Sequence, residues 1–519
     1  MKALDLQTQI GQRLAVGFPG YEIPSELTEL VKRYHVGNII LFAENIRDNG
    51  QLKRLCRELQ ELIVGETGFP AFIGIDQEGG VVSRLGPDAA TPPSAMCVAA
   101  TGDPYNAYEA GLMTGRELRA LGVNFDFAPD MDVNSNPQNP VIGVRSYGDT
   151  PEIVARYGTE MMRGLTDGGV LCCAKHFPGH GDTALDSHLS LPIVDKSLAE
   201  LEACELKPFR AAIAAGVPAV MTTHILFPQL EPEKTPATMS RRIITGLLKE
   251  RLGFTGLVVS DCMMMQAIQA YYGTVNGILA AVGAGVDLVL SSHSIEYARK
   301  ACEAMREAVR EGGLSAEEMK SSAEKIIRAK TALAPAPDNA EIVGCEAHRQ
   351  TVRRIMDQGL TLVGSPTGEC PPLGEKPLFM GCHPFRPTIA SNPEDESVSF
   401  PETMRSLLGG EAVNTPTDPT DEEIGSLALR AAGHSAVVIG TYNGHIKTGQ
   451  LKLVRALARL DAPVVCVALR NPYDLLGLPD GVTRIAAYEY DSLSMEAVAR
   501  LLRGEQRATG RLPLSLTEA

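Results

Sequence analysis

The chain has 519 residues, a formal net charge of −15 and a pI near 5.3, with 44% apolar and 21% charged residues. This length exceeds what one hydrophobic core usually organises, so we expect two or three domains, and the composition excludes a disordered or fibrous protein. The acidic balance excludes the basic surface that phosphate backbones require, so neither nucleic acid nor an anionic membrane is an expected partner.

The first twenty residues are interrupted by Asp5, Gln7 and Gln9, so we do not expect a signal peptide. No stretch reaches the roughly 18–20 apolar residues of a membrane span. The eleven cysteines are scattered among apolar neighbours, and none is spaced as a CxxC pair. This usage is typical of reduced thiols, so we expect a cytoplasmic protein.

Short apolar runs alternate with longer amphipathic stretches through the first two thirds of the chain. The runs cover residues 37–43, 71–76, 123–129, 170–176, 217–224, 257–261 and 286–292. Near-continuous apolar runs are typical of parallel strands buried on both faces. Seven or eight strand–helix repeats over about 330 residues predict an α/β fold of the TIM type, a (β/α)8 barrel.

Polar residues stand at or just past the C-terminal ends of five runs. They are Asp76, Asp130, the pair Lys175–His176, His224 and Asp261. Barrel enzymes build their sites at this rim, because only there do residues from many strands meet. The pattern therefore predicts one active site at the C-terminal mouth of the barrel.

A polar stretch that contains Pro335 and Pro337 separates these repeats from the rest of the chain. Five further apolar runs follow it on a smaller scale. We therefore predict a barrel domain over residues 1–333, a linker over 334–344 and a smaller α/β sandwich domain over 345–519.

The segment AKHFPGHGDTALDSH, residues 174–188, holds the densest set of reactive side chains. Pro178 and two glycines end the strand, so the segment forms a loop at the rim that its glycines can make mobile. An Asp two residues before a His can accept its Nδ1–H, so Asp186 and His188 are a candidate proton-transfer dyad.

Two simpler interpretations of this loop stay open. It can be a polar loop that satisfies its own backbone, or His176, His180 and His188 could in principle bind zinc. A spacing of four residues places two histidines on one face only in a helix, and Pro178 with its glycines argues against a helix. We predict no metal and no cofactor.

Asp261 follows an apolar strand directly, and a carboxylate is costly to hold there without a partner. It can cap the next helix, or it can be a nucleophile or a metal ligand. The cations and donors Lys175, His176 and Arg145 on neighbouring strands favour an ionised carboxylate that attacks or binds a cationic centre.

Together these segments resemble family 3 of the glycoside hydrolases, specifically the NagZ-type β-N-acetylglucosaminidases in their two-domain form. The resemblance rests on KHFPGHGDTALDSH (175–188), GIDQEGGVVSRL (74–85), VRSYG (144–148) and VVSD (258–261). It covers the whole first domain in order. ALRNPYDL and AYEYDSLSMEAVARLLRGE look like the α/β sandwich appended in two-domain members.

The resemblance implies a role for each matching residue. Asp261 is the expected nucleophile, and Asp186 with His188 is the expected acid/base dyad. The residues expected to bind the sugar are Asp76, Arg84, Arg145, Lys175 and His176. Since the chain has no Trp, any platform for sugar stacking must be Phe, Tyr, Met or a peptide plane.

The implied function is a retaining β-N-acetylhexosaminidase, active on short glycans or muropeptides through a covalent aspartyl–glycosyl intermediate, as a monomer or homodimer. The alternatives within the family are a β-glucosidase and a β-N-acetylglucosaminide phosphorylase, because a neutral imidazole base does not repel phosphate. Outside it, Lys175 could be the amine of a Schiff-base aldolase, or the chain could be a non-catalytic sugar sensor.

Overall fold

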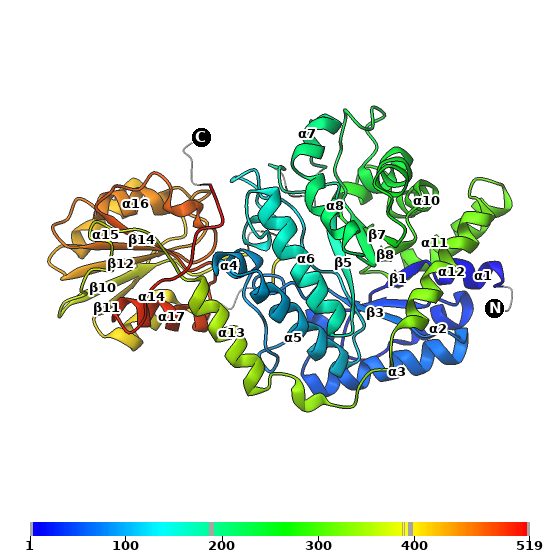
Figure 1. Ribbon diagram of the computed structural model, residues 1–519, viewed down its shortest axis with the longest axis horizontal. Helices are drawn as coiled ribbons and strands as arrows, with labels where there is room; N and C mark the ends of the chain where they lie inside the picture. The colour runs from blue at the N-terminus through cyan, green and yellow to red at the C-terminus, as the bar shows by residue number, and fades with distance from the viewer. Residues whose placement is uncertain are drawn as a thin grey trace.

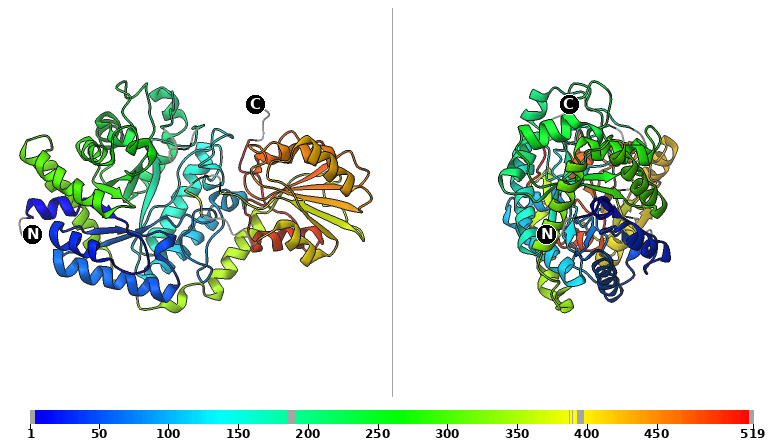
Figure 2. Two further views of the ribbon diagram at one scale, coloured as in Figure 1. Left: turned by 180° about the vertical axis from the view of Figure 1, so that it is seen from behind. Right: turned by 90° about the vertical axis from the view of Figure 1, so that its right-hand side faces the viewer.

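The computed structural model describes residues 4–184, 186, 191–386, 388, 390–392 and 398–515. Its two parts lie side by side along the long axis of the molecule, a barrel and a second α/β unit (Figures 1 and 2). Helix α13 (Glu346–Gly359) leads from one to the other.

Eight parallel strands close the barrel in sequential order. They are β1 (Leu14–Val16), β2 (Asn38–Ile40), β3 (Phe72–Ile75), β4 (Phe125–Asp126), β5 (Leu171–Phe177), β6 (Ala219–Thr222), β7 (Leu257–Cys262) and β8 (Leu288–Ser291). The β-rich apolar runs form these strands because each is buried on both faces, by the barrel interior and by the surrounding helices.

The helices around the barrel are α1 (Leu6–Gly11), α2 (Ser25–Tyr34), α3 (Asn49–Thr67), α4 (Ala95–Ala100), α5 (Tyr105–Leu121), α6 (Pro151–Asp167), α7 (Leu198–Ala203), α8 (Leu206–Ala214), a π-helix (Arg242–Arg251), α9 (Gln266–Gln269), α10 (Thr274–Ala284), α11 (Ile295–Arg310) and α12 (Ala316–Ala332). Local chemistry fixes several of their ends. Asp48 caps α3 by accepting from the Gln51 N–H, and Gly68 ends it in the left-handed region.

A packed apolar core fills the barrel interior. Phe72, Phe125 and Phe127 lie in contact there, with ring centroids 5.0 and 4.8 Å apart. Ile326 of α12 belongs to the same core, and Lys330 one turn later lies over the Phe72 ring at 5.7 Å. Helix α12 therefore closes the N-terminal end of the barrel, and any site must open at the other end.

The second unit is a six-stranded sheet in the order β11-β10-β12-β13-β14-β9, parallel except for β9. The strands are β9 (Thr361–Gly364), β10 (Pro377–Gly381), β11 (Glu411–Asn414), β12 (Ala436–Thr441), β13 (Val464–Ala468) and β14 (Val482–Ala486). The helices after α13 are α14 (Phe400–Leu408), α15 (Asp421–Ala431), α16 (Gly449–Leu457) and α17 (Ser492–Leu502).

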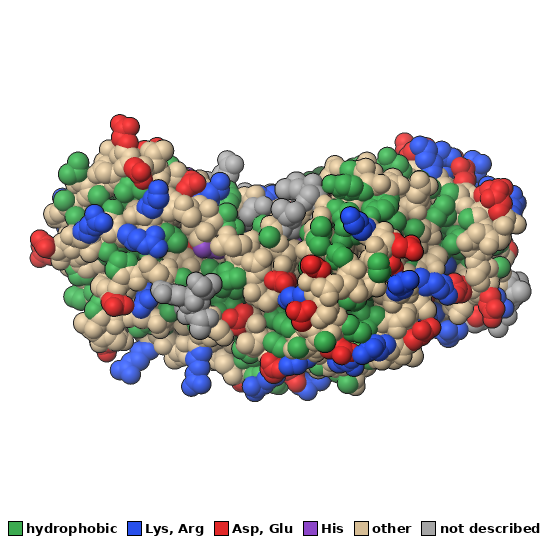
Figure 3. Space-filling model, turned by 90° about the horizontal axis from the view of Figure 1, so that it is seen from above, with side chains coloured by type: hydrophobic (Ala, Val, Ile, Leu, Met, Phe, Trp, Pro, Cys, Tyr) green, Lys and Arg blue, Asp and Glu red, His purple; other side chains and the backbone are tan. Residues whose placement is uncertain are grey.

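The predicted fold class, a TIM-type barrel followed by a smaller α/β unit, is confirmed. The seven apolar runs coincide with β2 to β8, while β1 and β11, of three and four residues, are not among the predicted strands. On the face in Figure 3, acidic and basic side chains are interspersed with apolar ones. No helix of the described residues has the length and apolar content needed to cross a bilayer.

The aromatic layer in the barrel interior gives a stability prediction. Phe72→Ala removes a ring that is 1% exposed, so we expect the barrel to lose about 3–5 kcal/mol of unfolding free energy. Urea unfolding followed by circular dichroism measures the loss. A loss below about 1 kcal/mol would contradict the packed interior.

Candidate active site

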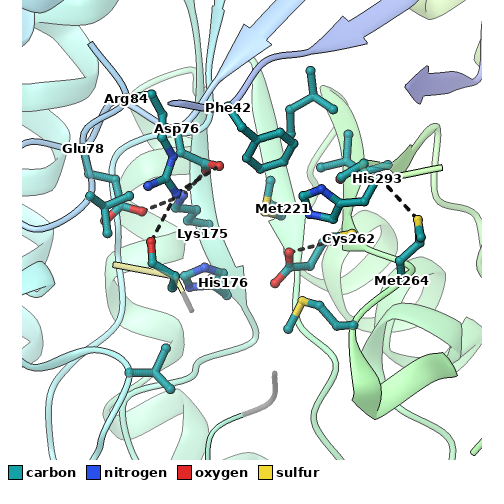
Figure 4. A pocket seen from close by; sticks show the side chains of 18 of the residues that line it. Phe42, Asp76, Glu78, Arg84, Lys175, His176, Met221, Cys262, Met264 and His293 are labelled. Carbon is teal, nitrogen blue, oxygen red and sulfur yellow. Dashed lines mark hydrogen bonds and ion pairs between the residues drawn. The ribbon is translucent and has the colours of Figure 1, made fainter. Parts of the chain in front are cut away.

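A cavity of about 550 Å³ opens at the C-terminal ends of the barrel strands (Figure 4). It is lined by side chains at or just past the C-terminal ends of β2, β3, β5, β6, β7 and β8 and by the loop after β4. Six predicted site residues line it together, namely Asp76, Arg84, Arg145, Lys175, His176 and Asp261. The tertiary structure thus brings residues from distant parts of the sequence to one mouth.

Lys175 and His176 are neighbours in β5, yet both line the cavity. Successive residues of a regular strand point to opposite faces. Here the pairing of β5 with β6 shifts register between Ala174 and Phe177, and such an irregularity re-aims side chains. The local departure from strand geometry therefore supplies two site residues where a regular strand would supply one.

Glu78 joins the two buried cations of the site. Its Oε1 lies 2.7 Å from Lys175 Nζ and 2.8 Å from Arg145 Nη2, and its Oε2 accepts from Arg145 Nε at 2.9 Å. Lys175 Nζ also donates to Asp76 Oδ1 at 2.8 Å. Figure 4 shows Glu78, Lys175 and Asp76 on the same wall, with Arg84 beside them.

Burial alone would raise the pKa of Glu78, but the charges of Arg145 and Lys175 outweigh it and hold that pKa below its usual value. Burial would likewise lower the pKa of Lys175, and Asp76 and Glu78 overcome this and raise it. Glu78, Lys175 and Arg145 are therefore charged at neutral pH. The wall is a fixed array of ions whose donors and acceptors are positioned before a ligand arrives.

A second network holds His176. Asp132 Oδ2 accepts from His176 Nδ1 at 2.7 Å, and Asp132 Oδ1 accepts from the backbone N–H of His180 at 2.6 Å. Burial and the neighbouring His176 lower the pKa of His180 to about 4, so that ring is neutral. Since Nδ1 of His176 is occupied, its Nε2 is the atom presented towards Arg145, 3.5 Å from Nη2.

Among the described residues, one set of potential metal-binding atoms gathers within 4.8 Å, from Asp130, Asp132 and His176. Burial and the neighbouring charge of Asp132 raise the pKa of Asp130 well above its ordinary value, which disfavours an anionic metal ligand there. Arg145 Nη2 lies 3.5 Å from Asp130 Oδ2, and Asp132 is bonded to His176. A guanidinium so close to the carboxylates competes with a bound cation, so the arrangement favours an internal ion network over a metal centre.

Asp261 lies in β7 where the pairing with β8 becomes irregular. Its Oδ1 accepts from the N–H of Cys262 at 2.6 Å, and the side chain lines the cavity. The aromatic rings of Phe42 and His293, with centroids 4.6 Å apart, lie across the cavity from Lys175 (Figure 4).

The structure describes one of the two residues of the predicted dyad, Asp186. Asp186 is buried, with 6% of its surface exposed. His188 lies outside the described residues.

The family profile described as "Glycosyl hydrolase family 3 N terminal domain" matches residues 5–329. The chain belongs to glycoside hydrolase family 3. It is 36% identical to "Beta-hexosaminidase A" of Pseudoalteromonas piscicida, over 64% of this chain and 59% of that protein. The chain thus spans about three fifths of that relative's length.

Two relatives align with nearly the whole family 3 chain. A "Beta-N-acetylglucosaminidase/beta-glucosidase" of Cellulomonas fimi is 27% identical over 95% of this chain and 90% of its own. The solved structure of a family 3 β-N-acetylglucosaminidase from Paenibacillus sp. str. FPU-7 superposes with a TM-score of 0.91, at 39% identity, over 99% of both chains. The two-part architecture is therefore shared within glycoside hydrolase family 3.

The second unit of this family 3 chain reaches the cavity. Arg386 and Ala390, from the segment after β10, line the same cavity as Asp261. Arg84 binds this segment through Asn392 Oδ1 at 2.9 Å and the Ala390 carbonyl at 3.1 Å, while its Nη2 lies 3.9 Å from Asp76 Oδ2. Arg84 therefore connects the second unit to the charged wall.

The second unit also supports the loop that carries Arg145. Asn134 donates to Tyr473 Oη at 2.8 Å and accepts from the Gly143 N–H at 3.2 Å. Gly143 has φ of +48°, and an added Cβ would meet Asn471 Oδ1 at 2.4 Å, so only glycine fits this contact. The position of Arg145 thus depends on residues more than 300 positions away.

Sequence reasoning missed Glu78, although it stands in the quoted GIDQEGG segment two residues after Asp76. An acid in a loop after a strand has no distinctive pattern, and only the convergence of Lys175 and Arg145 on it reveals its role. Phe42 and His293 were also missed, since each is a single aromatic residue just past a strand end.

Neutralising Glu78 tests the charged wall. Glu78→Gln leaves Lys175 and Arg145 without their shared counter-charge, so we expect kcat/KM to fall at least about 100-fold on an aryl glycoside. Glu44→Gln, an exposed acid at the rim of the same cavity, is the matched control and should change kcat/KM less than about 3-fold. Equal effects of the two substitutions would contradict a special role for Glu78.

Proposed function

We propose that this family 3 chain is a retaining β-N-acetylhexosaminidase that releases terminal β-linked N-acetylglucosamine from short glycans. Asp261 is the nucleophile, Asp186 and His188 form the acid/base dyad, and Asp76, Arg84, Arg145, Lys175 and His176 bind the sugar. The observation that supports it is that the Asp261 carboxylate lines the same cavity as the ion-paired side chains of the opposite wall.

The charged wall suits a sugar. Its ion-paired carboxylates and ammonium group offer fixed acceptors and donors to several hydroxyls at once, which orients the reacting carbon towards Asp261. A cavity of about 550 Å³ lies within the range for small-molecule sites, and the Phe42–His293 pair offers an aromatic surface in a chain without Trp.

The same wall makes a poor proton donor. Asp76 and Glu78 are ion-paired with Lys175 at 2.8 and 2.7 Å. Although burial opposes it, the charges of Arg145 and Lys175 hold the pKa of Glu78 below its usual value, so Glu78 stays an anion. A glycosidic oxygen needs a proton as it leaves, because an alkoxide is a poor leaving group. His188 on the rim loop therefore donates this proton, because a histidine exchanges protons near neutral pH.

The reaction then follows a double displacement. Protonated His188 gives its proton to the leaving oxygen as Asp261 attacks the anomeric carbon, so the glycosidic bond breaks and an α-linked glycosyl–aspartate ester forms. Neutral His188 next removes a proton from water, which attacks the same carbon and displaces Asp261. Asp186 orients the imidazole throughout, and the product keeps the β configuration.

The sugar preference and setting rest on the relatives and on the cysteines. The Paenibacillus structure and the Pseudoalteromonas relative carry names that specify N-acetylglucosaminide or hexosaminide cleavage. All eleven cysteines of this chain are free thiols, which is typical of a reducing compartment. We therefore place the enzyme in the cytoplasm, acting on disaccharide- or muropeptide-sized fragments of the cell wall.

Asp261→Gly tests the nucleophile. Removing the carboxylate should lower kcat on 4-nitrophenyl N-acetyl-β-glucosaminide by about 10⁴-fold or more, with an unchanged thermal melting curve. Mass spectrometry of the wild type with a slow substrate should find the covalent sugar on the peptide that contains Asp261. An adduct on another residue, or activity within about 10-fold of wild type, would refute the assignment.

His188→Ala tests the acid. A nitrophenolate leaves with little protonation whereas a sugar alkoxide does not, so the loss on N,N′-diacetylchitobiose should exceed the loss on the nitrophenyl substrate by about 10²-fold. Steady-state kinetics on both substrates measures the ratio. Equal losses would show that His188 serves binding alone.

A further inference from the structure

A second cavity, of about 730 Å³, lies at the closed end of the barrel, away from the mouth. Helices α3 and α5, which lie side by side, form two of its walls (Figure 1). The end of α12, residues 333–338 and the residues Pro70, Gly122 and Asn124 before β3 and β4 form the rest. We call it the floor cavity. It shares no lining residue with the active-site cavity.

Two buried basic side chains line the floor cavity, Arg119 at 5% exposure and Lys330 at 2%. Arg119 donates to the Ala334 carbonyl, and Lys330 donates to Gln12 Oε1 at 2.6 Å and to the Gly37 carbonyl at 2.8 Å. These partners are neutral. Within the described part of the chain, no carboxylate lies within 4 Å of either basic group.

Three more cations from α3 surround the cavity, Lys53, Arg54 and Arg57. Arg57 Nε lies 3.7 Å from Glu61 Oε1 one turn along the same helix. The only acid among its described lining residues is Asp338, which lies 2.7 Å from Lys53 and so neutralises that residue alone. With Lys53 and Arg57 each beside an acid, Arg54 and Arg119 leave the described lining with an excess of positive charge, in a protein whose net charge is −15.

The two buried basic side chains differ in how they keep a charge. Burial lowers the pKa of Lys330 well below its ordinary value, with no acid to oppose the effect, which favours the neutral amine. Burial also lowers the pKa of Arg119, but a guanidinium stays charged at neutral pH. A buried charge without a counter-charge is unfavourable, so an anion that enters the cavity gains the full attraction of Arg119.

We propose that the floor cavity binds a small organic anion of the phosphomonoester class, with Arg119 as its anchor. A guanidinium presents paired N–H donors that match the oxygens of a phosphate, and Arg54 and Arg57 at the rim attract a multiply charged group. Pro70, Leu333 and Pro335 line the same cavity and contact the uncharged part of the ligand. The volume lies within the range for small-molecule sites.

Thermal unfolding of the full chain tests the proposal, with glucose 6-phosphate and inorganic phosphate as probes and with glucose and sodium chloride at matched ionic strength as controls. Because a ligand that binds only the folded state raises Tm, we expect 10 mM glucose 6-phosphate to raise it by at least about 2 °C, and the controls to raise it less than about 0.5 °C. A rise with inorganic phosphate as large as with the sugar phosphate would assign recognition to the phosphate group alone. No rise with either phosphate overturns the proposal.

Substitutions locate the site. Arg119→Gln should abolish the rise, and Arg116→Gln, an exposed Arg three residues earlier on α5, is the matched control and should keep it. If Arg119→Gln fails to fold, the rim double variant Arg54→Gln/Arg57→Gln replaces it, since both side chains are exposed. We expect that variant to raise the half-saturating concentration of glucose 6-phosphate at least about 5-fold. Its rate of glycoside hydrolysis should equal that of the wild type. An unchanged concentration in the rim variant would show that the anion binds elsewhere and would refute the proposal.

Discussion

The shared carboxylate of Glu78 is the interaction on which the rest of the active site depends. Lys175 and Arg145 are buried at 2% and 5% exposure, and buried cations of this kind require a counter-charge within contact. Glu78 contacts both, and Asp76 and Asp130 extend the network on either side. The side chains that face the ligand are thereby fixed in place by one another, with little freedom left to lose when a sugar binds.

The second unit contacts the loops that carry this network. The charged side chains at a barrel mouth keep fixed positions only if the loops that carry them are supported by other contacts. Loops at the ends of short strands have few contacts of their own. Arg84 is bonded to the segment after β10, and the loop of Arg145 rests on Tyr473 and Asn471. The α/β sheet therefore acts as a support for the rim as well as contributing Arg386 to the cavity.

The buried basic side chains at the two ends of the barrel have different kinds of partner. At the mouth every buried cation meets an acid, so the network is complete within the protein. At the floor, Arg119 and Lys330 meet only neutral oxygens. Because the cations at the mouth are already ion-paired and Arg119 at the floor is not, we infer that the mouth binds a neutral sugar and the floor an anion.

The sequence by itself determined the barrel, the second α/β unit and the set of polar strand ends, because period, strand length and the position of a residue after an apolar run are local properties. It placed Asp76, Lys175, His176 and Asp261 at one rim through that rule alone. Only the tertiary structure decided that Glu78 unites Lys175 with Arg145, that Phe42 faces them beside His293, and that the second unit reaches the cavity. Those contacts join residues 67 to 339 positions apart, and no local pattern specifies which distant charges meet.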